Sequence, residues 1–269
     1  MKKFLNLFIF ILIVVVSIQI SSACCTQPKV EYKNGIYHII LDGKTFAKKI
    51  QFISCDKLIS NQEIHEKTKS KLTINTGFFD PKNQKTISYI VSEMNTVAED
   101  PVFNENLMSN SFLRKNLDKI LNRTEFRVLE CDGKYSFDIT PHNTPLEFQS
   151  NIITSAQGGP MLLPDLRLEE EFFVVKNSDG KVIRDSISAL HKCARTIIGI
   201  KDGDVHILVI TNENPMTLPQ VRDYCKELGF EKAMAFDGGS STSLNYKKIN
   251  VVSTKSPSGR LLKSFMIIR

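Results

Sequence analysis

The chain contains the sequence Phe-Asp-Gly-Gly-Ser-Ser-Thr at residues 236–242, directly after the apolar run 233–236. The apolar run predicts a short buried strand, and it places Asp237 at the carboxyl end, where open α/β sheets usually bind ligands. The two glycines would let a ligand approach the main chain, and the three hydroxyls can bind anionic oxygens. The stretch therefore predicts a site for a phosphate or another oxyanion. The alternative is a tight turn in which Asp237 only caps backbone N–H groups.

The first 23 residues have the layout of a secretory signal peptide. Two lysines precede an apolar stretch over residues 4–20, and three small residues follow it. We expect residues 1–23 to be removed, which leaves one domain over residues 24–269, secreted or held in the cell envelope. An uncleaved membrane anchor is the alternative, because the apolar stretch is near the lower length limit of a membrane span. In a bacterial lipoprotein, Cys24 would carry the lipid anchor.

The net charge is mildly positive and spread along the chain. Without Lys2 and Lys3, 33 basic and 29 acidic residues remain. No block of basic residues and no interleaved basic and aromatic pattern occurs, so we expect no nucleic-acid partner, and no partner protein is predicted. The cysteines are too widely spaced for a zinc module, and an exported protein is expected to form one or two disulfides, whose pairing stays open. The six are Cys24, Cys25, Cys55, Cys131, Cys193 and Cys225.

Turn signals dominate the local pattern and predict a body rich in antiparallel sheet. Five Asn-Gly or Asp-Gly pairs indicate β-hairpins, at residues 34–35, 42–43, 132–133, 179–180 and 202–203. Three helices are expected, over Glu63–Ser70, Leu107–Leu121 and Thr217–Leu228. The fold class is therefore α+β, a single domain with mixed, largely antiparallel β-sheets and a few packed helices. Residues 92–122, polar and helical, are the expected insertion or lid.

Three further clusters combine glycines with polar side chains. The sequence Asn-Thr-Gly-Phe-Phe-Asp begins at Asn75, and Gln-Gly-Gly-Pro begins at Gln157. Ala-Arg-Thr at residues 194–196 opens an apolar strand with Arg195, whose guanidinium can hold two phosphate oxygens at once. Taken singly, the two amides could only stabilise turns, and Arg195 could be a solvated charge at a strand end.

In this order the four segments resemble the phosphodiester glycosidase family, and the resemblance covers about residues 30–269. The segments similar to that family are Asn75–Phe79, Gln157–Pro160, Arg195–Gly199 and Asp237–Ser241. Two positions depart from the pattern: Thr76 stands where a small Gly or Ala is usual, and residues 210–213 lack the Asp-Gly that often closes that strand. The resemblance implies a hydrolase that cleaves a sugar-1-phosphodiester at the anomeric carbon, and a small-molecule or polymeric glycan as substrate.

The expected catalytic residues are Asp237, Arg195 and Asp80. Asp237 would stabilise the oxocarbenium centre or activate water, and Arg195 would hold the phosphate as its charge grows. Asp80 is the first candidate for a second carboxylate, with Glu213 behind it. The expected substrate-binding residues are Asn75, Gly77, Gln157, Gly159, Thr196, Gly238, Gly239, Ser240, Ser241 and Thr242.

We expect no cofactor. The five histidines are scattered, so none has metal-ligand spacing and none is identified as the base for a serine nucleophile. A divalent cation such as calcium, held by Asp237 and carbonyl oxygens, is the alternative. The alternative function is a non-catalytic cell-surface module that binds a phosphate-linked glycan.

Overall fold

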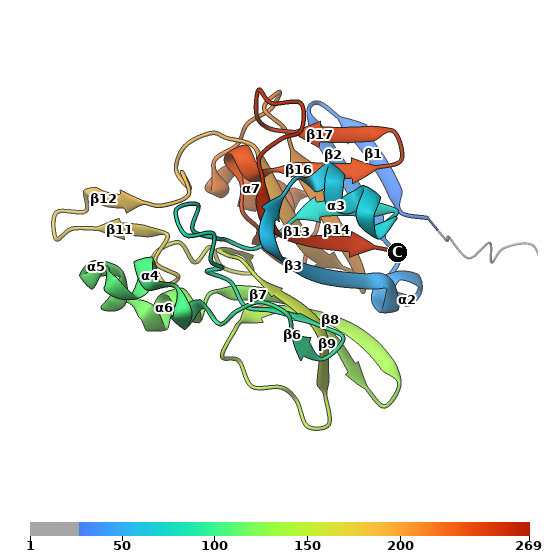
Figure 1. Ribbon diagram of the computed structural model, residues 1–269, viewed down its shortest axis with the longest axis horizontal. Coiled ribbons are helices and arrows are strands. Elements are labelled where there is room, and N and C mark those ends of the chain that lie inside the picture. Colours follow the sequence, from blue (N-terminus) through green and yellow to red (C-terminus); the bar gives the residue numbers. More distant parts are fainter. Residues whose placement is uncertain (1–26) are drawn as a thin grey trace, which may run out of the picture.

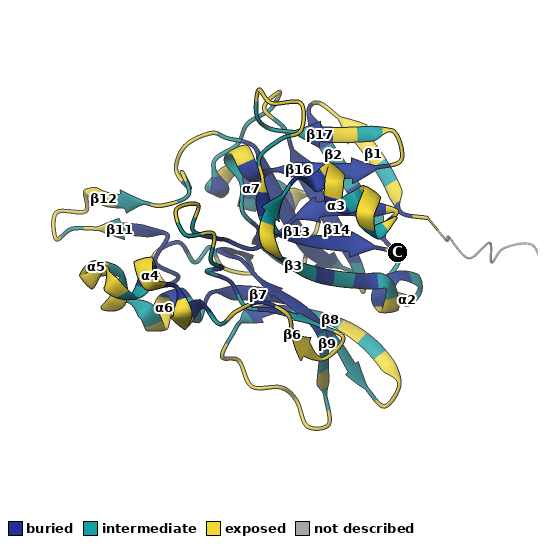
Figure 2. Ribbon diagram, viewed as in Figure 1, coloured by how far each residue is buried: buried dark blue, intermediate teal, exposed yellow. Residues whose placement is uncertain are grey.

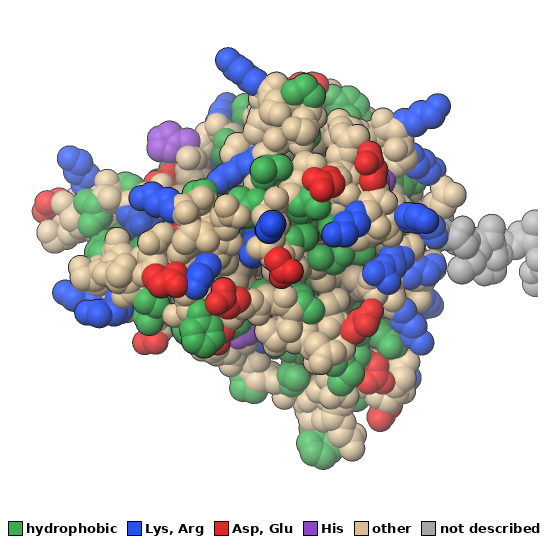
Figure 3. All heavy atoms as spheres, viewed as in Figure 1, with side chains coloured by type: hydrophobic (Ala, Val, Ile, Leu, Met, Phe, Trp, Pro, Cys, Tyr) green, Lys and Arg blue, Asp and Glu red, His purple; other side chains and the backbone are tan. Residues whose placement is uncertain are grey.

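The computed structural model describes residues 27–269, which form three antiparallel sheets and a two-stranded arm (Figure 1). The predicted signal peptide and Cys24 lie outside the described residues. Within residues 27–269, no helix combines the length and the apolar character that a bilayer span requires. Basic and acidic side chains are interspersed over the face in view (Figure 3). The predicted α+β fold class is confirmed.

The first sheet has six strands in the order β1-β2-β14-β13-β15-β10. Their bounds are Lys29–Lys33, Ile36–Leu41, Asp204–Ile210, Arg195–Lys201, Lys232–Ala235 and Met161–Leu163. The central strands β13 and β14 are buried along nearly their whole length, and most of their middle residues are apolar (Figure 2). A strand with apolar residues on both faces needs cover on both sides, and here a helix covers one face and the other sheets cover the opposite face.

The second and third sheets have five strands each, in the orders β17-β16-β4-β18-β3 and β6-β5-β9-β7-β8. The second sheet comprises Ile249–Val252, Ser243–Tyr246, Leu72–Asn75, Leu262–Ile268 and Ile50–Ile59. The third comprises Asn95–Thr96, Ile90–Ser92, Asn151–Gln157, Thr124–Cys131 and Lys134–Pro141. The two-stranded arm pairs β11 (Val174–Lys176) with β12 (Val182–Asp185).

Two large apolar clusters hold these layers together. The first joins all three sheets, with Ile198 of β13, Ile74 of β4 and Phe126 of β7 among its fully buried members. The second lies under α7 (Leu218–Glu227), which packs Leu218 and Val221 against the other face of the first sheet. Burial of a large aliphatic or aromatic side chain contributes about 1.5–3 kcal/mol, so the sheets are fixed firmly relative to one another.

Four of the five predicted hairpins are confirmed. The pairs at residues 34–35, 132–133, 179–180 and 202–203 join β1 to β2, β7 to β8, β11 to β12 and β13 to β14. The hairpin predicted at residues 42–43 is wrong. Asp42 instead caps the short helix α2 (Gly43–Phe46) by accepting a hydrogen bond from the Thr45 N–H. A Cβ atom on Gly43 would lie 2.1 Å from the Gly203 carbonyl oxygen, so close packing explains this glycine.

Two of the three predicted helices are confirmed. Helix α3 covers Asn61–Thr68, and α7 begins after a capping box formed by Thr217 and Gln220. The single helix predicted over Leu107–Leu121 is wrong, because three short helices occupy this segment. They are α4 (Glu105–Ser109), α5 (Ser111–Arg114) and α6 (Leu117–Leu121). The Asn110 side chain accepts from the Leu113 N–H and begins a new helix, the cap role that asparagine prefers.

The three short helices lie beside the arm on one side of the molecule (Figure 1). Phe112 of α5 packs on Phe172 at the base of the arm, with ring centroids 5.2 Å apart. The remaining elements are the 3₁₀ helices η1 (Ala47–Lys49), η2 (Pro101–Phe103) and η3 (Gly239–Ser241).

Candidate active site

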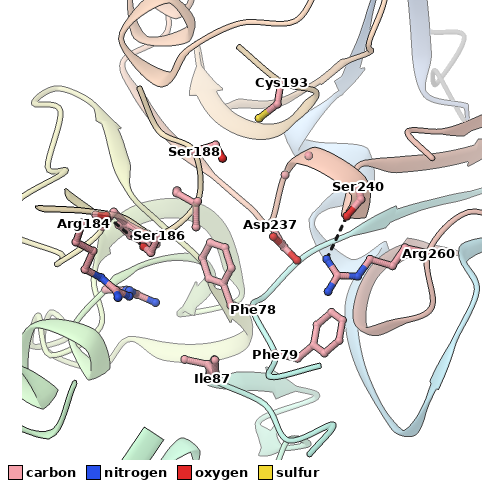
Figure 4. Close-up of a pocket in the computed structure, with 15 residues that line it drawn as sticks. Phe78, Phe79, Ile87, Arg184, Ser186, Ser188, Cys193, Asp237, Ser240 and Arg260 are labelled. Carbon is pink, nitrogen blue, oxygen red and sulfur yellow. Dashed lines mark hydrogen bonds between the residues drawn. The ribbon is translucent and has the colours of Figure 1, made fainter. Parts of the chain in front are cut away.

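Asp237 lies in the loop where the chain leaves the first sheet after β15 and enters the second sheet at β16. Both sheets fix this loop. The Asp237 N–H donates to the Thr76 carbonyl at 2.9 Å, and the Asn75 side-chain amide donates to the Asp237 carbonyl at 2.6 Å. On the other side, the Gly239 N–H donates to the Ala194 carbonyl at 2.8 Å. The main chain is thus held while the carboxyl group points into a cavity (Figure 4).

Glycine is favoured at each of the two positions after Asp237, for a different geometric reason. A Cβ atom on Gly238 would come within 3.1 Å of the Ala194 carbonyl oxygen, because the loop lies directly on the start of β13. Gly239 has a φ of +59°, the left-handed region that glycine adopts most easily, and nothing lies within 4 Å of its Cβ position. The first glycine allows close packing, and the second turns the chain into η3.

The cavity that receives the Asp237 carboxyl group has a volume of about 420 Å³. Its wall combines three guanidinium groups with aromatic rings and small polar groups. Its lining residues include Phe78, Phe79, Ile87, Arg123, Phe173, Arg184, Ser186, Ile187, Ser188, Cys193, Gly238, Gly239, Ser240 and Arg260. Within residues 27–269, Asp237 is the only Asp or Glu that lines it. The site therefore offers one carboxyl group in a cationic environment.

Burial raises the pKa of Asp237 from its ordinary value of 3.8 to about 6. A Ser241 hydrogen bond, the positive charge of Arg260 and the Gly238 N–H act in the opposite direction, but burial outweighs them. A carboxyl group with this pKa can be ionised at neutral pH and still take up a proton readily. Such a group can act as a base toward water or as a charge that faces a cationic centre.

Arg260 is one of three cavity-lining arginines that sequence reasoning missed, with Arg123 and Arg184. It lies in the loop between β17 and β18, and one terminal nitrogen donates to the hydroxyls of Ser240 and Ser241, both at 3.2 Å. Its guanidinium also lies 5.1 Å from the Phe79 ring centroid. Residues 256–259 before it, Ser-Pro-Ser-Gly, indicate a surface loop and carry no signal for a binding site.

The structure places Arg195 behind the wall of the cavity. Its buried guanidinium makes four hydrogen bonds, all to main-chain carbonyls. Nε donates to Met216 at 3.0 Å, and the terminal nitrogens donate to Ile187, Ser188 and His191 at 3.2, 2.7 and 2.8 Å. Arg195 therefore fixes the loop over residues 187–191, which forms one wall of the cavity, and does not line the cavity itself.

Asn75 and Thr196 also act behind the cavity. The side-chain oxygen Oδ1 of Asn75 accepts from the Thr196 hydroxyl at 2.7 Å and from the Ser243 N–H at 3.0 Å. Its side-chain NH₂ group donates to the Asp237 main-chain carbonyl. Both residues are buried, and neither lines the cavity. Their predicted place near Asp237 agrees with the structure, but their side chains bind protein groups where a sugar hydroxyl was expected.

Three more predicted binding residues lie behind the cavity: Gln157, Gly77 and Gly159. The Gln157 amide donates to the carbonyls of Leu121 and Arg123, at 2.7 and 3.1 Å. A Cβ atom on Gly77 would lie 2.7 Å from the Ser88 Cβ, and one on Gly159 would lie 2.2 Å from a carboxylate oxygen of Glu171. These residues pack main-chain segments together behind the site, and they do not line the cavity.

The structure separates both second-carboxylate candidates from Asp237. Asp80 accepts hydrogen bonds from the Lys82 N–H and the Asn106 side chain, each at 2.8 Å, and lines a neighbouring cavity of about 440 Å³. Glu213 is exposed and accepts a short hydrogen bond from the Tyr32 hydroxyl. Neither residue lines the cavity that receives the Asp237 carboxyl group.

The hydroxyl residues of the loop have three different environments. Ser240 is exposed and lines the cavity, whereas Ser241 is buried between Asp237 and Arg260. Thr242 is buried, and within residues 27–269 its hydroxyl has no hydrogen-bond partner. Of these three hydroxyl residues, only Ser240 both lines the cavity and is open to a ligand.

The cysteines that the structure describes are unpaired. Cys55, Cys131, Cys193 and Cys225 are all free thiols, so the expected disulfides do not form among these four residues. Cys193 lines the cavity, and burial raises the pKa of its thiol. Over residues 27–269, no three His, Cys, Asp or Glu side chains gather in a way that could hold a metal ion.

Comparison with known proteins agrees with this architecture. The phosphodiester glycosidase family model matches residues 68–268. The structure is similar to the catalytic domain of zebrafish N-acetylglucosamine-1-phosphodiester alpha-N-acetylglucosaminidase, auto-inhibited by its pro-peptide. The TM-score is 0.62 at 13% identity, over 90% of this chain and 81% of that chain. A hypothetical protein from Synechocystis is similar with a TM-score of 0.56 at 12% identity, over 90% and 61% of the two chains. No curated protein matches the sequence.

Proposed function

The chain belongs to the phosphodiester glycosidase family, and we propose that it is an exported hydrolase that cleaves a sugar-1-phosphodiester at the anomeric carbon. The observation that carries the proposal is the Asp237 carboxyl group, which faces a cavity lined by three guanidinium groups. The cations suit an anionic substrate, and the single carboxylate suits a reaction whose leaving group needs little protonation.

The phosphate contributes to its own departure. A phosphodiester oxygen leaves as a stabilised anion, so bond cleavage depends less on a general acid than it does in an ordinary glycoside. We assign the binding of this phosphate to Arg260 and Ser240, which both line the cavity. A terminal nitrogen of Arg260 donates to the Ser240 hydroxyl at 3.2 Å. Their positive charge and hydroxyl group would stabilise the negative charge that grows on the departing phosphate.

Asp237 acts on the sugar side of the same bond. As the bond between the anomeric carbon and the phosphate oxygen breaks, the ionised carboxylate stabilises the positive charge on the ring or takes a proton from the attacking water. The water oxygen bonds to the anomeric carbon, keeps one proton as the new sugar hydroxyl and loses the other to Asp237, which releases it to solvent. The products are a free sugar and a phosphate monoester.

Two substitutions and one control test the assignment. The substrates are UDP-N-acetylglucosamine and the nitrophenyl phosphodiester of the same sugar, and the readout is free reducing sugar. We expect Asp237→Asn and Arg260→Gln each to lower kcat/KM roughly a hundredfold to a thousandfold. Glu213→Gln removes a carboxylate outside the cavity and should leave the rate unchanged.

Near-normal rates in both cavity variants would contradict the assignment. Tight binding of these substrates by the wild type without release of sugar would instead support the non-catalytic glycan-binding module. Circular dichroism and thermal denaturation of each variant establish that the protein is folded, so that a lost rate reports on chemistry.

We also propose that the mature protein works outside the cytoplasm, either secreted or in the cell envelope. The support is the basic, apolar and small-residue order of residues 1–23. Mass spectrometry of the exported protein should give a chain that begins at residue 24, with a lipid on Cys24 if the anchor is used. A chain that keeps residue 1 and stays in the cytoplasm would contradict the proposal.

A further inference from the structure

The cavity has a second cationic region formed by Arg123 and Arg184. Arg123 immediately precedes β7, and Arg184 lies on β12 of the arm. Both line the same cavity as Asp237. The assignment of phosphate to Arg260 leaves these two charges without a function.

Arg123 is buried without an anionic partner for its terminal nitrogens. The residue is only 6% exposed, and its Nε donates to the Glu171 main-chain carbonyl at 3.1 Å. The guanidinium lies 3.9 Å from the Phe173 ring centroid, so one face is covered by an aromatic ring. Within residues 27–269, its two terminal nitrogens take part in no hydrogen bond or ion pair. They are free to bind a group that enters the cavity.

The nearby carboxylate of Glu171 does not fill this gap. Its oxygens accept hydrogen bonds from the Thr124 N–H and hydroxyl and from the Met161 N–H, at 3.1, 2.7 and 2.9 Å. Burial raises the pKa of Glu171 and lowers the pKa of Arg123 to about 9, while the attraction between the two charges acts in the opposite direction on both groups. Because the Glu171 oxygens are bound to other donors, an anionic ligand at the terminal nitrogens of Arg123 would further offset the cost of burying this cation.

Arg184 places a second positive charge beside the first. Its Nε donates to the Phe172 carbonyl at 3.3 Å, its guanidinium lies over the Phe172 ring, and the side chain is partly buried. Its charge contributes to the lowered pKa of Arg123, so the two guanidinium groups that line this cavity repel each other. Two guanidinium groups arranged in this way match the charge and the donor requirements of a phosphoryl group.

Asp237 lies between Arg184 and Arg260 in the close-up view (Figure 4). Figure 4 shows Arg184 on one side of the carboxyl group and Arg260 on the other. The electrostatics agree, because Arg260 is among the groups that shift the pKa of Asp237 and neither Arg123 nor Arg184 is. If the anomeric carbon faces Asp237 and its phosphate faces Arg260, the far side of the sugar ring faces Arg123 and Arg184.

We propose that Arg123 and Arg184 form a second anion subsite, which binds a phosphoryl group carried on a ring hydroxyl of the same sugar. The substrate class is then a sugar phosphorylated both at the anomeric carbon and at another hydroxyl, as in a polymer whose sugars are joined through phosphodiesters. This proposal rests on the proposed function, because that function places the sugar over Asp237.

A binding experiment tests the subsite without requiring turnover. Calorimetry compares glucose 1,6-bisphosphate with glucose 1-phosphate, which differ only in the second phosphoryl group. We expect the wild type to bind the bisphosphate at least tenfold more tightly, since a charge-assisted hydrogen bond contributes roughly a tenfold to a hundredfold gain. Arg184→Gln should abolish this preference and leave the affinity for glucose 1-phosphate within about threefold. Arg184→Lys should retain part of the preference.

Arg222→Gln is the matched control, because Arg222 pairs with Asp223 on α7 outside the cavity. Equal binding of both sugars by the wild type would overturn the subsite. An equal loss of both ligands in Arg184→Gln would also overturn it, because Arg184 would then bind the anomeric phosphate. A strong preference for the bisphosphate in a protein that hydrolyses no phosphodiester would leave the subsite standing and contradict only the hydrolase proposal.

Discussion

The side-chain amide of Asn75 donates a hydrogen bond of 2.6 Å to the main-chain carbonyl of Asp237. This hydrogen bond joins the end of a strand in the second sheet to the loop that leaves the first sheet. The Asn75 oxygen accepts from Thr196 and Ser243, so one amide connects both sheets to the catalytic candidate. Asn75 is therefore a positioning residue.

Asn75→Ala should lower both stability and turnover. The substitution leaves the Asp237 carbonyl, the Thr196 hydroxyl and the Ser243 N–H without their partner, and each unsatisfied buried group costs roughly 1–3 kcal/mol. Denaturant unfolding measures the loss of stability, and we expect kcat to fall more than KM rises. Asn250→Ala, on an exposed position of β17, serves as the control. An unchanged unfolding free energy would contradict the connecting role.

Arg195→Lys separates a structural role from a phosphate-binding role. Lysine keeps the positive charge, but its three donors on one atom cannot reproduce four hydrogen bonds made from a planar guanidinium. We expect the unfolding free energy to fall by roughly 1.5–3 kcal/mol for each hydrogen bond that the lysine fails to make. A variant with wild-type stability and a raised KM alone would show that Arg195 binds substrate directly.

The pH dependence of the rate should follow the ionisation of Asp237. With a pKa of about 6, the carboxylate form increases as the pH rises from 5 to 7. If the ionised form is active, kcat/KM of the wild type should rise over this range and then level off. The residual rate of Asp237→Asn should lack this rise. A wild-type profile that falls from pH 5 to pH 7 would assign Asp237 the role of a proton donor.

Asp237→Asn should stabilise the protein at neutral pH. The pKa of Asp237 is raised in the folded state, so the stability contributed by its protonated form is lost as the pH rises from 3.8 to about 6 and is absent at pH 7. We expect the variant to gain roughly 1–3 kcal/mol at pH 7 and little at pH 4, where the carboxyl group is protonated in the folded state. Asp165→Asn, an exposed control, should show no such difference. A variant less stable than the wild type at pH 7 would contradict the burial cost.

His206 should produce the opposite pH effect. Its Nδ1 atom lies 2.8 Å from Nε2 of His38, and burial lowers the pKa of His206 to about 4. In the unfolded chain, His206 takes up a proton near pH 6.5. The stability that its neutral form contributes is therefore fully present above pH 6.5 and is lost as the pH falls toward 4. Between pH 7 and 5 the loss should be roughly 1–2 kcal/mol. Thermal unfolding of His206→Gln should show a flatter pH dependence than that of the wild type.

The sequence predicts the framework of the site better than its charges. Asp237 and its glycines can be identified because both glycines meet strict backbone requirements, and such requirements leave a local pattern. Four turn pairs indicate hairpins for the same reason. Arg123, Arg184 and Arg260 leave no pattern, because each is a single arginine whose role depends on segments far away in the chain. Arg195 stands in a recognisable motif, yet its partners are carbonyls of residues 187–191 and 216 that no local pattern reveals.

The prediction of one long helix fails for a physical reason. The spacing of Leu113, Leu117 and Ile120 indicates one apolar stripe, but Asn110 and Asn116 interrupt it. Asn110 caps a new helix, and the Asn116 side chain donates to the Phe112 carbonyl, four residues earlier. Side-chain hydrogen bonds to the main chain compete with helix continuation, and here they outweigh the periodic pattern.

The two-stranded arm belongs to none of the three large sheets, although it contributes Arg184 to the cavity. Insertions, deletions or replacements in its hairpin should therefore leave the register of the central strands unaltered. If the chain is the proposed hydrolase, the arm is a part that evolution can remodel for new sugars while inheriting the Asp237 loop intact, and relatives that diverge in substrate range are expected to differ first in the arm.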